Sequence, residues 1–201
     1  MKNQYVGDIG DYGKYALLRT LISKCYSIGI NWYLTPNDAK TDGKHTNYLL
    51  KDRDILDDEL FNELKSLLIT KDNQVRIENR NIAAIEKSKI LKNTVYFNEM
   101  LDYENIKTNR NEYRKDWINH SIDILGKSDI IFLDPDNGLE VKCVPPTRKN
   151  GNKYITYEEA AIYYEQAKMA LVIYNHRDHS LESTYIERFL KGCDHKSVVG
   201  L

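Results

Sequence analysis

The sequence predicts an α/β protein, a Rossmann-like three-layer sandwich built on a mostly parallel sheet. Short apolar runs alternate along the chain with stretches of helical periodicity. Strands that are apolar throughout, rather than at every second residue, are typical of parallel sheets buried on both faces. Right-handed crossovers between such strands place helices on either side of the sheet. At 201 residues, the chain suits a single domain, 1–201, with a substantial core.

The elements follow in a regular order. The first helical stretch is expected to end at Gly29, and Thr156 and Glu159 occupy capping-box positions in a later one. The chain stops at or just after an apparent strand, which leaves open an incomplete final edge of the domain. The expected helical stretches are 12–29, 57–69, 79–91, 111–125, 153–168 and 180–193. The expected strands are 30–35, 94–98, 129–134, 170–175 and 197–201.

Composition excludes several classes of protein. The formal net charge is −1, so nucleic-acid binding would need a local basic patch. Cys25, Cys143 and Cys193 share no CxxC spacing, which argues against a disulfide framework or a zinc cluster. No run approaches the ~20 apolar residues of a membrane span, and the first residues lack the apolar core of a signal peptide. We therefore expect a cytoplasmic protein without membrane contact. Segment 142–152, rich in Pro, Gly and basic residues, is expected to be a mobile loop.

Polar residues follow three of the predicted strands. Since parallel strands end at the same edge of a sheet, these residues could meet in one cleft. A fourth polar cluster, "GDIGDYGKY", precedes the first helix. The three strand-end clusters are Pro36, Asn37, Asp38, Asp42, Gly43, Lys44 and His45; then Asp134, Asp136, Asn137 and Glu140; then Asn175, His176, Arg177, Asp178 and His179.

Most of these clusters also have a plain structural explanation. Asp8 or Asp11 could cap the first helix, and "TPND" around Asp38 is a common turn sequence. "LDPDNG" is harder to explain in this way, because a turn needs one Asp or Asn rather than two acids flanking a proline. Asp134 and Asp136 are therefore predicted to belong to a site.

The strings "GDIGDYGKYALLRTL", "WYLTPNDAKTDGKH" and "FLDPDNGLE" resemble those of a group of small bacterial and phage proteins over nearly the whole chain. More distantly, the first forty residues and the central strand resemble RlmJ-type adenine-N6 methyltransferases of ribosomal RNA. In that family a strand ends in Asp-Pro-Pro-Tyr, and the Asp accepts a hydrogen bond from the adenine amino group. Asp134 and Pro135 match the first two positions, whereas Asp136 and Asn137 replace the second Pro and the aromatic residue. No glycine-rich loop follows the first strand.

The resemblance implies an S-adenosylmethionine-dependent methyltransferase-like protein that acts on nucleic acid or a nucleotide. Asp134 would orient the acceptor. The candidate catalytic residues are Asp134, Asp136, Asn137 and His176, and the candidate cofactor-binding residues are Asp8, Asp11, Lys14 and Asp38.

A second hypothesis comes from the residues alone. Asp134 and Asp136, with Asp38 or Glu140, could ligate Mg²⁺ or Mn²⁺ in a phosphoester hydrolase or nuclease, with His176 activating water. A third is an inactive binding module in phage or defence biology. The sequence identifies neither a substrate nor an oligomeric state.

Overall fold

The computed structural model describes residues 1–39, 43–51, 57–176, 183 and 186–187. Its centre is a four-stranded, all-parallel sheet in the order β2-β1-β3-β6. The predicted α/β fold is confirmed. The paired strands are β1 (Ile28–Asn31), β2 (Thr94–Phe97), β3 (Ile130–Leu133) and β6 (Ala170–Ile173).

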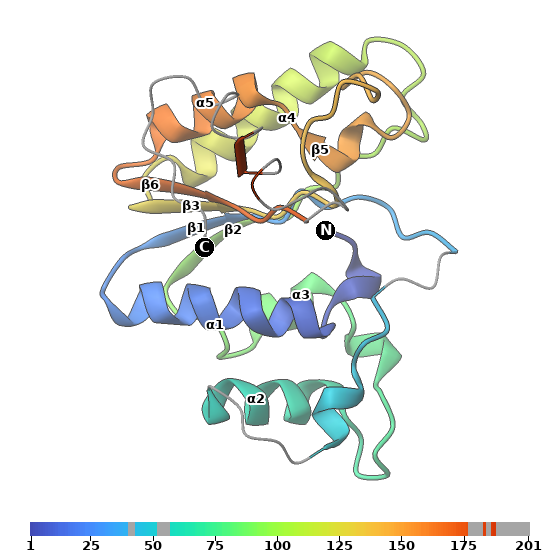
Figure 1. Cartoon of the computed structure of the whole chain (residues 1–201), viewed down its shortest axis with the longest axis vertical. Helices are drawn as coiled ribbons and strands as arrows, with labels where there is room; N and C mark the ends of the chain where they lie inside the picture. Colours follow the sequence, from blue (N-terminus) through green and yellow to red (C-terminus); the bar gives the residue numbers. More distant parts are fainter. Residues whose placement is uncertain (40–42, 52–56, 177–182, 184–185, 188–201) are drawn as a thin grey trace.

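Helices cover both faces of this sheet (Figure 1). Helices α1 (Ile9–Ser23) and α3 (Ile82–Lys87) lie on one face, and α2 (Asp58–Leu68) packs beyond α1. Helices α4 (Arg110–Leu125) and α5 (Tyr157–Gln166) lie on the other face. Short 3₁₀ turns complete the described chain: η1 (Asn3–Tyr5), η2 (Asn47–Leu50), η3 (Ile77–Asn79) and η4 (Gly151–Lys153).

Each face of the sheet has its own hydrophobic core. Alternate residues of a strand point to opposite faces, so Ile130 and Phe132 of β3 join the core beneath α1. Ile131 and Leu133 join the core beneath α4 and α5. All four side chains are buried. This two-sided burial explains why the strand is apolar throughout its sequence.

The first strand begins two residues earlier than the sequence predicts. Helix α1 ends at Ser23, and Cys25, rather than a glycine, takes the left-handed conformation, with φ of 65°. Gly29 does not stop the helix but lies inside β1. A Cβ at Gly29 would lie 2.7 Å from Oγ of Ser128, so this glycine serves close packing between β1 and the end of α4.

Other boundaries agree with the sequence or shift modestly. The capping box of Thr156 and Glu159 is present at α5, and Asp57 caps α2 by accepting a hydrogen bond from the Leu60 amide at 2.9 Å. Helix α3 is shorter than the expected 79–91. The expected strand 197–201 and most of the expected helix 180–193 lie outside the described residues.

A small second sheet was not predicted. Its parallel strands, β4 (Gly138–Leu139) and β5 (Tyr154–Ile155), enclose segment 142–152. That segment, whose mobility stays a prediction, is joined to α4 by hydrogen bonds, including one from Arg110 Nη1 to the Thr147 carbonyl at 3.0 Å. Among the described helices, none is both long and apolar enough to cross a membrane.

Candidate functional site at the carboxyl edge of the sheet

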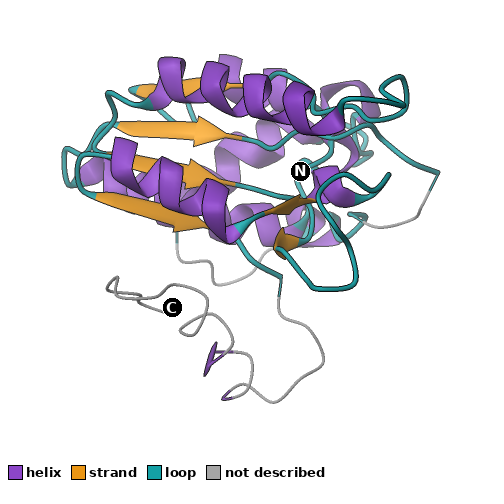
Figure 2. Cartoon of the chain, turned by 90° about the horizontal axis from the view of Figure 1, so that it is seen from above, coloured by secondary structure: helices purple, strands orange, loops and turns teal. Residues whose placement is uncertain are grey.

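A pocket of about 350 Å³ opens at the edge where the parallel strands end. Figure 2 shows the strands pointing toward this edge and the N-terminus. The chain leaves β1 toward β2 but leaves β3 toward β6, so the edge contains a topological switch point, where open α/β sheets bind ligands. The lining residues are Met1, Tyr5, Asp8, Gly10, Asp11, Lys14, Gly43, His45, Asp134, Pro135, Asp136, Asn137, Tyr174 and His176.

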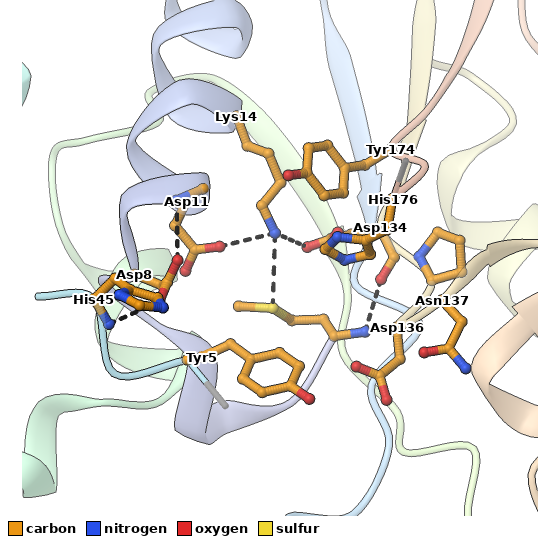
Figure 3. Close-up of a pocket in the computed structure, with 14 residues that line it drawn as sticks. Tyr5, Asp8, Asp11, Lys14, His45, Asp134, Asp136, Asn137, Tyr174 and His176 are labelled. Carbon is orange, nitrogen blue, oxygen red and sulfur yellow. Dashed lines mark hydrogen bonds and ion pairs between the residues drawn. The ribbon is translucent and has the colours of Figure 1, made fainter. Parts of the chain in front are cut away.

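Asp134 and Lys14 form the buried centre of this pocket (Figure 3). Asp134 follows β3 directly, and its amide donates to the Asn31 carbonyl of β1 at 3.0 Å. Lys14 Nζ lies 2.8 Å from Oδ2 of Asp134 and 2.8 Å from Oδ1 of Asp11. One ammonium group therefore bridges two carboxylates that come from α1 and β3.

This arrangement fixes the charge of Lys14. Burial alone would lower its pKa, but the carboxylates of Asp11 and Asp134 outweigh that effect and raise the pKa above its usual range. The ammonium also lies 4.6 Å from the centre of the Tyr174 ring, a cation–π contact. Lys14 is thus a permanent cation with its donors engaged, not a nucleophile.

Asp136 belongs to a second, neighbouring ion cluster. Its Oδ2 lies 3.1 Å from Nζ of Lys2, which also contacts Oδ2 of Asp38 at 3.0 Å. Lys153 Nζ approaches the same carboxylates of Asp136 and Asp38 at 3.7 and 3.9 Å. The cluster ties the start of the chain to the segments that follow β1 and β3.

The segment after β1 is closed by packing. Trp32 and Tyr33 are fully buried, and the Thr35 amide donates to the Met1 carbonyl at 2.9 Å. The amino group of Met1 donates to the Asp134 carbonyl at 2.7 Å; burial lowers the pKa of this group to about 6. The pocket therefore lies between α1 and the segments after β3 and β6, and the segment after β1 contributes Gly43 and His45 near its end.

The rim of the pocket is more accessible. His176 is exposed, and its ring meets that of Tyr174 edge to face, with ring centres 5.0 Å apart. Partial desolvation lowers the pKa of His176 below its ordinary value, against the opposing charge of Asp134. Across the pocket, Asp8 caps α1 by accepting from the Gly10 amide at 3.1 Å, and its other oxygen accepts from the His45 amide at 3.0 Å.

The structure brings together almost all the residues that the sequence singles out. Asp8, Asp11, Lys14, Asp134, Asp136, Asn137 and His176 line the pocket. Asp38 does not line it but reaches Asp136 through Lys2, and the Asn137 side chain is exposed. Glu140 is outside the lining set and accepts a hydrogen bond from the Tyr157 amide at 2.8 Å. Asp42, Arg177, Asp178 and His179 lie outside the described residues.

Sequence reasoning missed several contributors. Lys2 and Tyr5 precede the first helix and follow no periodic pattern, so nothing in the sequence pairs them with Asp38 or Asp136. Tyr174 was included in a predicted strand, but it follows the end of β6 and reaches the pocket. Its position, directly after a strand that ends at the same edge as Asp134, was the available signal.

Gly138 shapes the turn behind this site, which gives a first prediction. Its φ is +90°, and a Cβ there would lie 1.7 Å from Oδ1 of Asn175, the atom that accepts from the Leu139 amide at 2.7 Å. Gly138→Ala should therefore lower the free energy of unfolding by about 1–3 kcal/mol through backbone strain. The Cβ also displaces the Asn175 side chain from the Leu139 amide, which adds to the loss. Urea denaturation measures this loss.

Gly13 offers the matched control. It lies in α1, and a Cβ there would meet nothing within 4 Å. Gly13→Ala should leave the protein as stable or add up to about 1 kcal/mol, because alanine favours helix. Equal effects of the two substitutions would contradict the role given to Gly138.

Comparison with known proteins adds no relative. A scan against protein-family models, a search of curated proteins and a search of solved structures each returned no match. Within the described part of the chain, no three His, Cys, Asp or Glu side chains gather as a metal ion would require.

Proposed function

We propose that the protein is an S-adenosylmethionine-dependent, methyltransferase-like enzyme that presents an amino group of its acceptor to Asp134. One observation carries the proposal: a buried carboxylate, paired with a lysine, lies at the carboxyl end of a central parallel strand in a pocket. An ionised carboxylate only accepts hydrogen bonds. Asp134 is therefore suited to receive an N–H from an amino-bearing acceptor.

The charge of the lining supports a cationic ligand. The lining side chains carry four carboxylates, on Asp8, Asp11, Asp134 and Asp136, and one ammonium group, on Lys14. Lys2, which does not line the pocket, balances Asp136, so the excess negative charge comes from Asp8 and from the pair that shares Lys14. The methyl donor carries a sulfonium and an ammonium group, which this lining would attract. A phosphate group would be repelled by the same carboxylates.

The donor fits the pocket in some respects and not in others. The rings of Tyr5 and Tyr174 line it, and aromatic faces attract cations. The volume lies at the lower end of the range for drug-sized ligands, about 300–1,000 Å³. The described start of the segment after β1, 32–35, is closed by packing and offers no backbone cradle, so the donor would be held by Asp8, Asp11 and the tyrosines instead.

The chain's own residues then have distinct roles. The donor, when bound, supplies an electrophilic methyl group. Asp134 orients the acceptor's amino group, and Lys14, 2.8 Å from Oδ2 of that carboxylate, holds it in place. His176, whose lowered pKa keeps its ring largely neutral near pH 7, can take the proton that the acceptor nitrogen loses.

The arrangement of lysines speaks against the metal-dependent hydrolase. The two aspartates of "DPDN" do not need a cation to relieve their repulsion, because Asp134 is paired with Lys14 and Asp136 with Lys2. A metal ion would have to displace buried ammonium groups from both carboxylates.

Calorimetric titration in EDTA tests the proposal. S-adenosylmethionine should bind at micromolar strength, its neutral thioether product more weakly, and adenosine monophosphate not detectably. Asp134→Asn should weaken donor binding by about tenfold, since it removes a negative charge near a cation, a loss of about 1.4 kcal/mol.

Asp129→Asn is the matched control. Asp129 precedes β3 at the opposite edge of the sheet, where it accepts from the amide of Ser27 at 2.9 Å, so its loss should leave donor affinity unchanged. Silence from the donor would overturn the proposal. Heat from Mn²⁺ alone would then favour the hydrolase, and silence from both ligands an inactive binding module.

A further inference from the structure

A basic surface lies beside the pocket, on segment 142–153 and the start of α4. Segment 142–153 contains Lys142, Arg148, Lys149 and Lys153 but no acidic residue. Lys142, Arg148 and Lys149 are exposed, as is Lys107 just before α4. Among the ion pairs of the described residues, none involves any of these four exposed cations. Lys153 differs, because it pairs with Asp38 and Asp136. The four exposed charges therefore face solvent.

The backbone that carries these cations is held in place. The Arg148 amide donates to the Pro145 carbonyl at 3.0 Å, and the Gly151 amide donates to the Arg148 carbonyl at 2.7 Å. From α4, Arg114 Nη1 donates to the Gly151 carbonyl at 2.9 Å. Two arginines of α4, this one and Arg110, thus hold the backbone of the segment, and its own cations lie on exposed positions of that backbone.

The start of α4 extends the surface. Figure 1 shows segment 142–153 beside this end of the helix, and the hydrogen bond from Arg110 to Thr147 joins the two. A hollow of about 410 Å³ lies between them, and the partial positive charge of a helix N-terminus adds to the field there. Its lining residues are Lys107, Asn109, Arg110, Asn111, Glu112 and Thr147.

The basic surface is continuous with the pocket. The Asn137 amide donates to the Lys153 carbonyl at 2.8 Å, and β4 pairs with β5, so both ends of the segment lie beside the "DPDN" turn. A ligand lying along the segment would pass the pocket's rim. The two regions differ in charge: the surface is basic, whereas the pocket lining is acidic.

We propose that this surface binds the phosphate backbone of a nucleic acid strand and so presents an uncharged base to the pocket. Because the lining carboxylates repel phosphate, the backbone stays on Lys142, Arg148 and Lys149 while a base amino group reaches Asp134. The chain's net charge of −1 gives no general attraction, so binding depends on this local patch. Delivery of the base rests on the proposed methyl transfer; binding of the backbone does not.

Anionic lipid is the weaker candidate for the same charges. Peripheral membrane binding usually combines basic residues with an amphipathic helix that inserts apolar side chains. Here the basic residues lie in turns, and the apolar Val144 among them is half-buried.

Fluorescence anisotropy with a labelled single-stranded oligonucleotide, measured in EDTA over a series of salt concentrations, tests the surface. The triple variant K142Q/R148Q/K149Q should bind more weakly, and the slope of log affinity against log salt should become shallower by about two units, since each phosphate contact adds roughly 0.7–0.9. The matched control is K87Q/K89Q/K92Q, which removes three exposed lysines in and just beyond α3, on the other face of the sheet. It should bind as the parent does.

The outcomes are distinct. Absence of parent binding, equal losses in both triple variants, or binding to anionic vesicles without binding to the oligonucleotide would each overturn the proposal. Donor calorimetry on the parent, set beside its oligonucleotide titration, separates the two proposals. Oligonucleotide binding by the parent with no donor heat would leave the surface standing and the methyltransferase wrong; donor heat without oligonucleotide binding would do the reverse.

Discussion

Lys14→Met is expected to lower the free energy of unfolding by about 3–5 kcal/mol, the usual loss when one partner of a buried ion pair is removed. The substitution keeps most of the side chain's volume but deletes the ammonium between Asp11 and Asp134. Those carboxylates are 2% and 1% exposed, so neither can recover its charge stabilisation from water. Urea denaturation at pH 7 measures the loss.

The loss of stability caused by Lys14→Met should be smaller at acid pH than at neutral pH, for the following reason. Burial already raises the pKa of Asp11 in the parent, and Lys14 opposes that rise. Without Lys14 the folded variant retains a proton on the pair, whereas the unfolded chain releases it above about pH 4. Stability of the variant should therefore be greatest below the unfolded pKa and should fall as pH rises through the higher folded pKa. The difference in the free energy of unfolding between the parent and the variant should be smaller at acid pH than at neutral pH.

Two further variants separate charge from volume. Lys14→Met/Asp134→Asn leaves a single buried carboxylate and should recover part of the lost stability. Lys24→Met, just beyond the end of α1 at an exposed position, should change stability by no more than about 0.5 kcal/mol. A Lys14→Met protein as stable as the parent, with the same pH profile, would contradict the bridging role.

The sequence was sufficient to group the site but not to describe its charge balance. Asp134 and His176 could be placed together because both follow apolar strands, and parallel strands end at one edge. The bridge between Lys14 and Asp134 could not be foreseen, since the two residues lie 120 positions apart and neither has a local pattern that indicates its partner. Lys14 was therefore predicted only as a cofactor contact, and its pairing with Asp11 and Asp134 was not foreseen.

The predicted end of the first strand, at residue 35, is wrong for a local reason, since β1 ends at Asn31. "INWYLT" is apolar enough to suggest a strand, but Asn31 ends the pairing: its Oδ1 accepts from the Tyr33 amide at 2.7 Å, a side-chain turn that competes with the ladder. Tyr33 then adopts φ of 47°. Asparagine favours turns of this kind, and its place in the middle of the apolar run was the signal against a longer strand.

The second large effect is expected at Arg114, a buried arginine of α4. The residue is 3% exposed. Its guanidinium pairs with Glu159 through two hydrogen bonds, one of 2.8 Å from Nη2 to Oε2, and also donates to the Gly151 and Tyr154 carbonyls. Arg114→Met should lower the free energy of unfolding by about 3–5 kcal/mol because it leaves Glu159 without its partner.

Arg19 provides a partly exposed comparison. It pairs with Asp57 at 2.8 Å and with Glu59, whose side chain is 64% exposed. Arg19→Met should cost no more than about 1 kcal/mol, since water screens such pairs. Arg114→Met/Glu159→Gln should recover part of the loss at the buried site, because glutamine can keep the capping box while removing the charge.

Arg114 also connects stability with the proposed binding surface. It is buried, but it donates to the Gly151 carbonyl of the segment that carries Lys142, Arg148 and Lys149, and to the Tyr154 carbonyl just after that segment. Once this support is lost, the segment and its cations must be ordered during binding, and this entropic cost should weaken oligonucleotide affinity. The exposed charges themselves do not change. Arg114→Met should therefore bind the oligonucleotide more weakly than the parent under conditions where both are folded, with little change in the salt slope. A reduced slope instead would mean that Arg114 itself reaches phosphate, contrary to its burial.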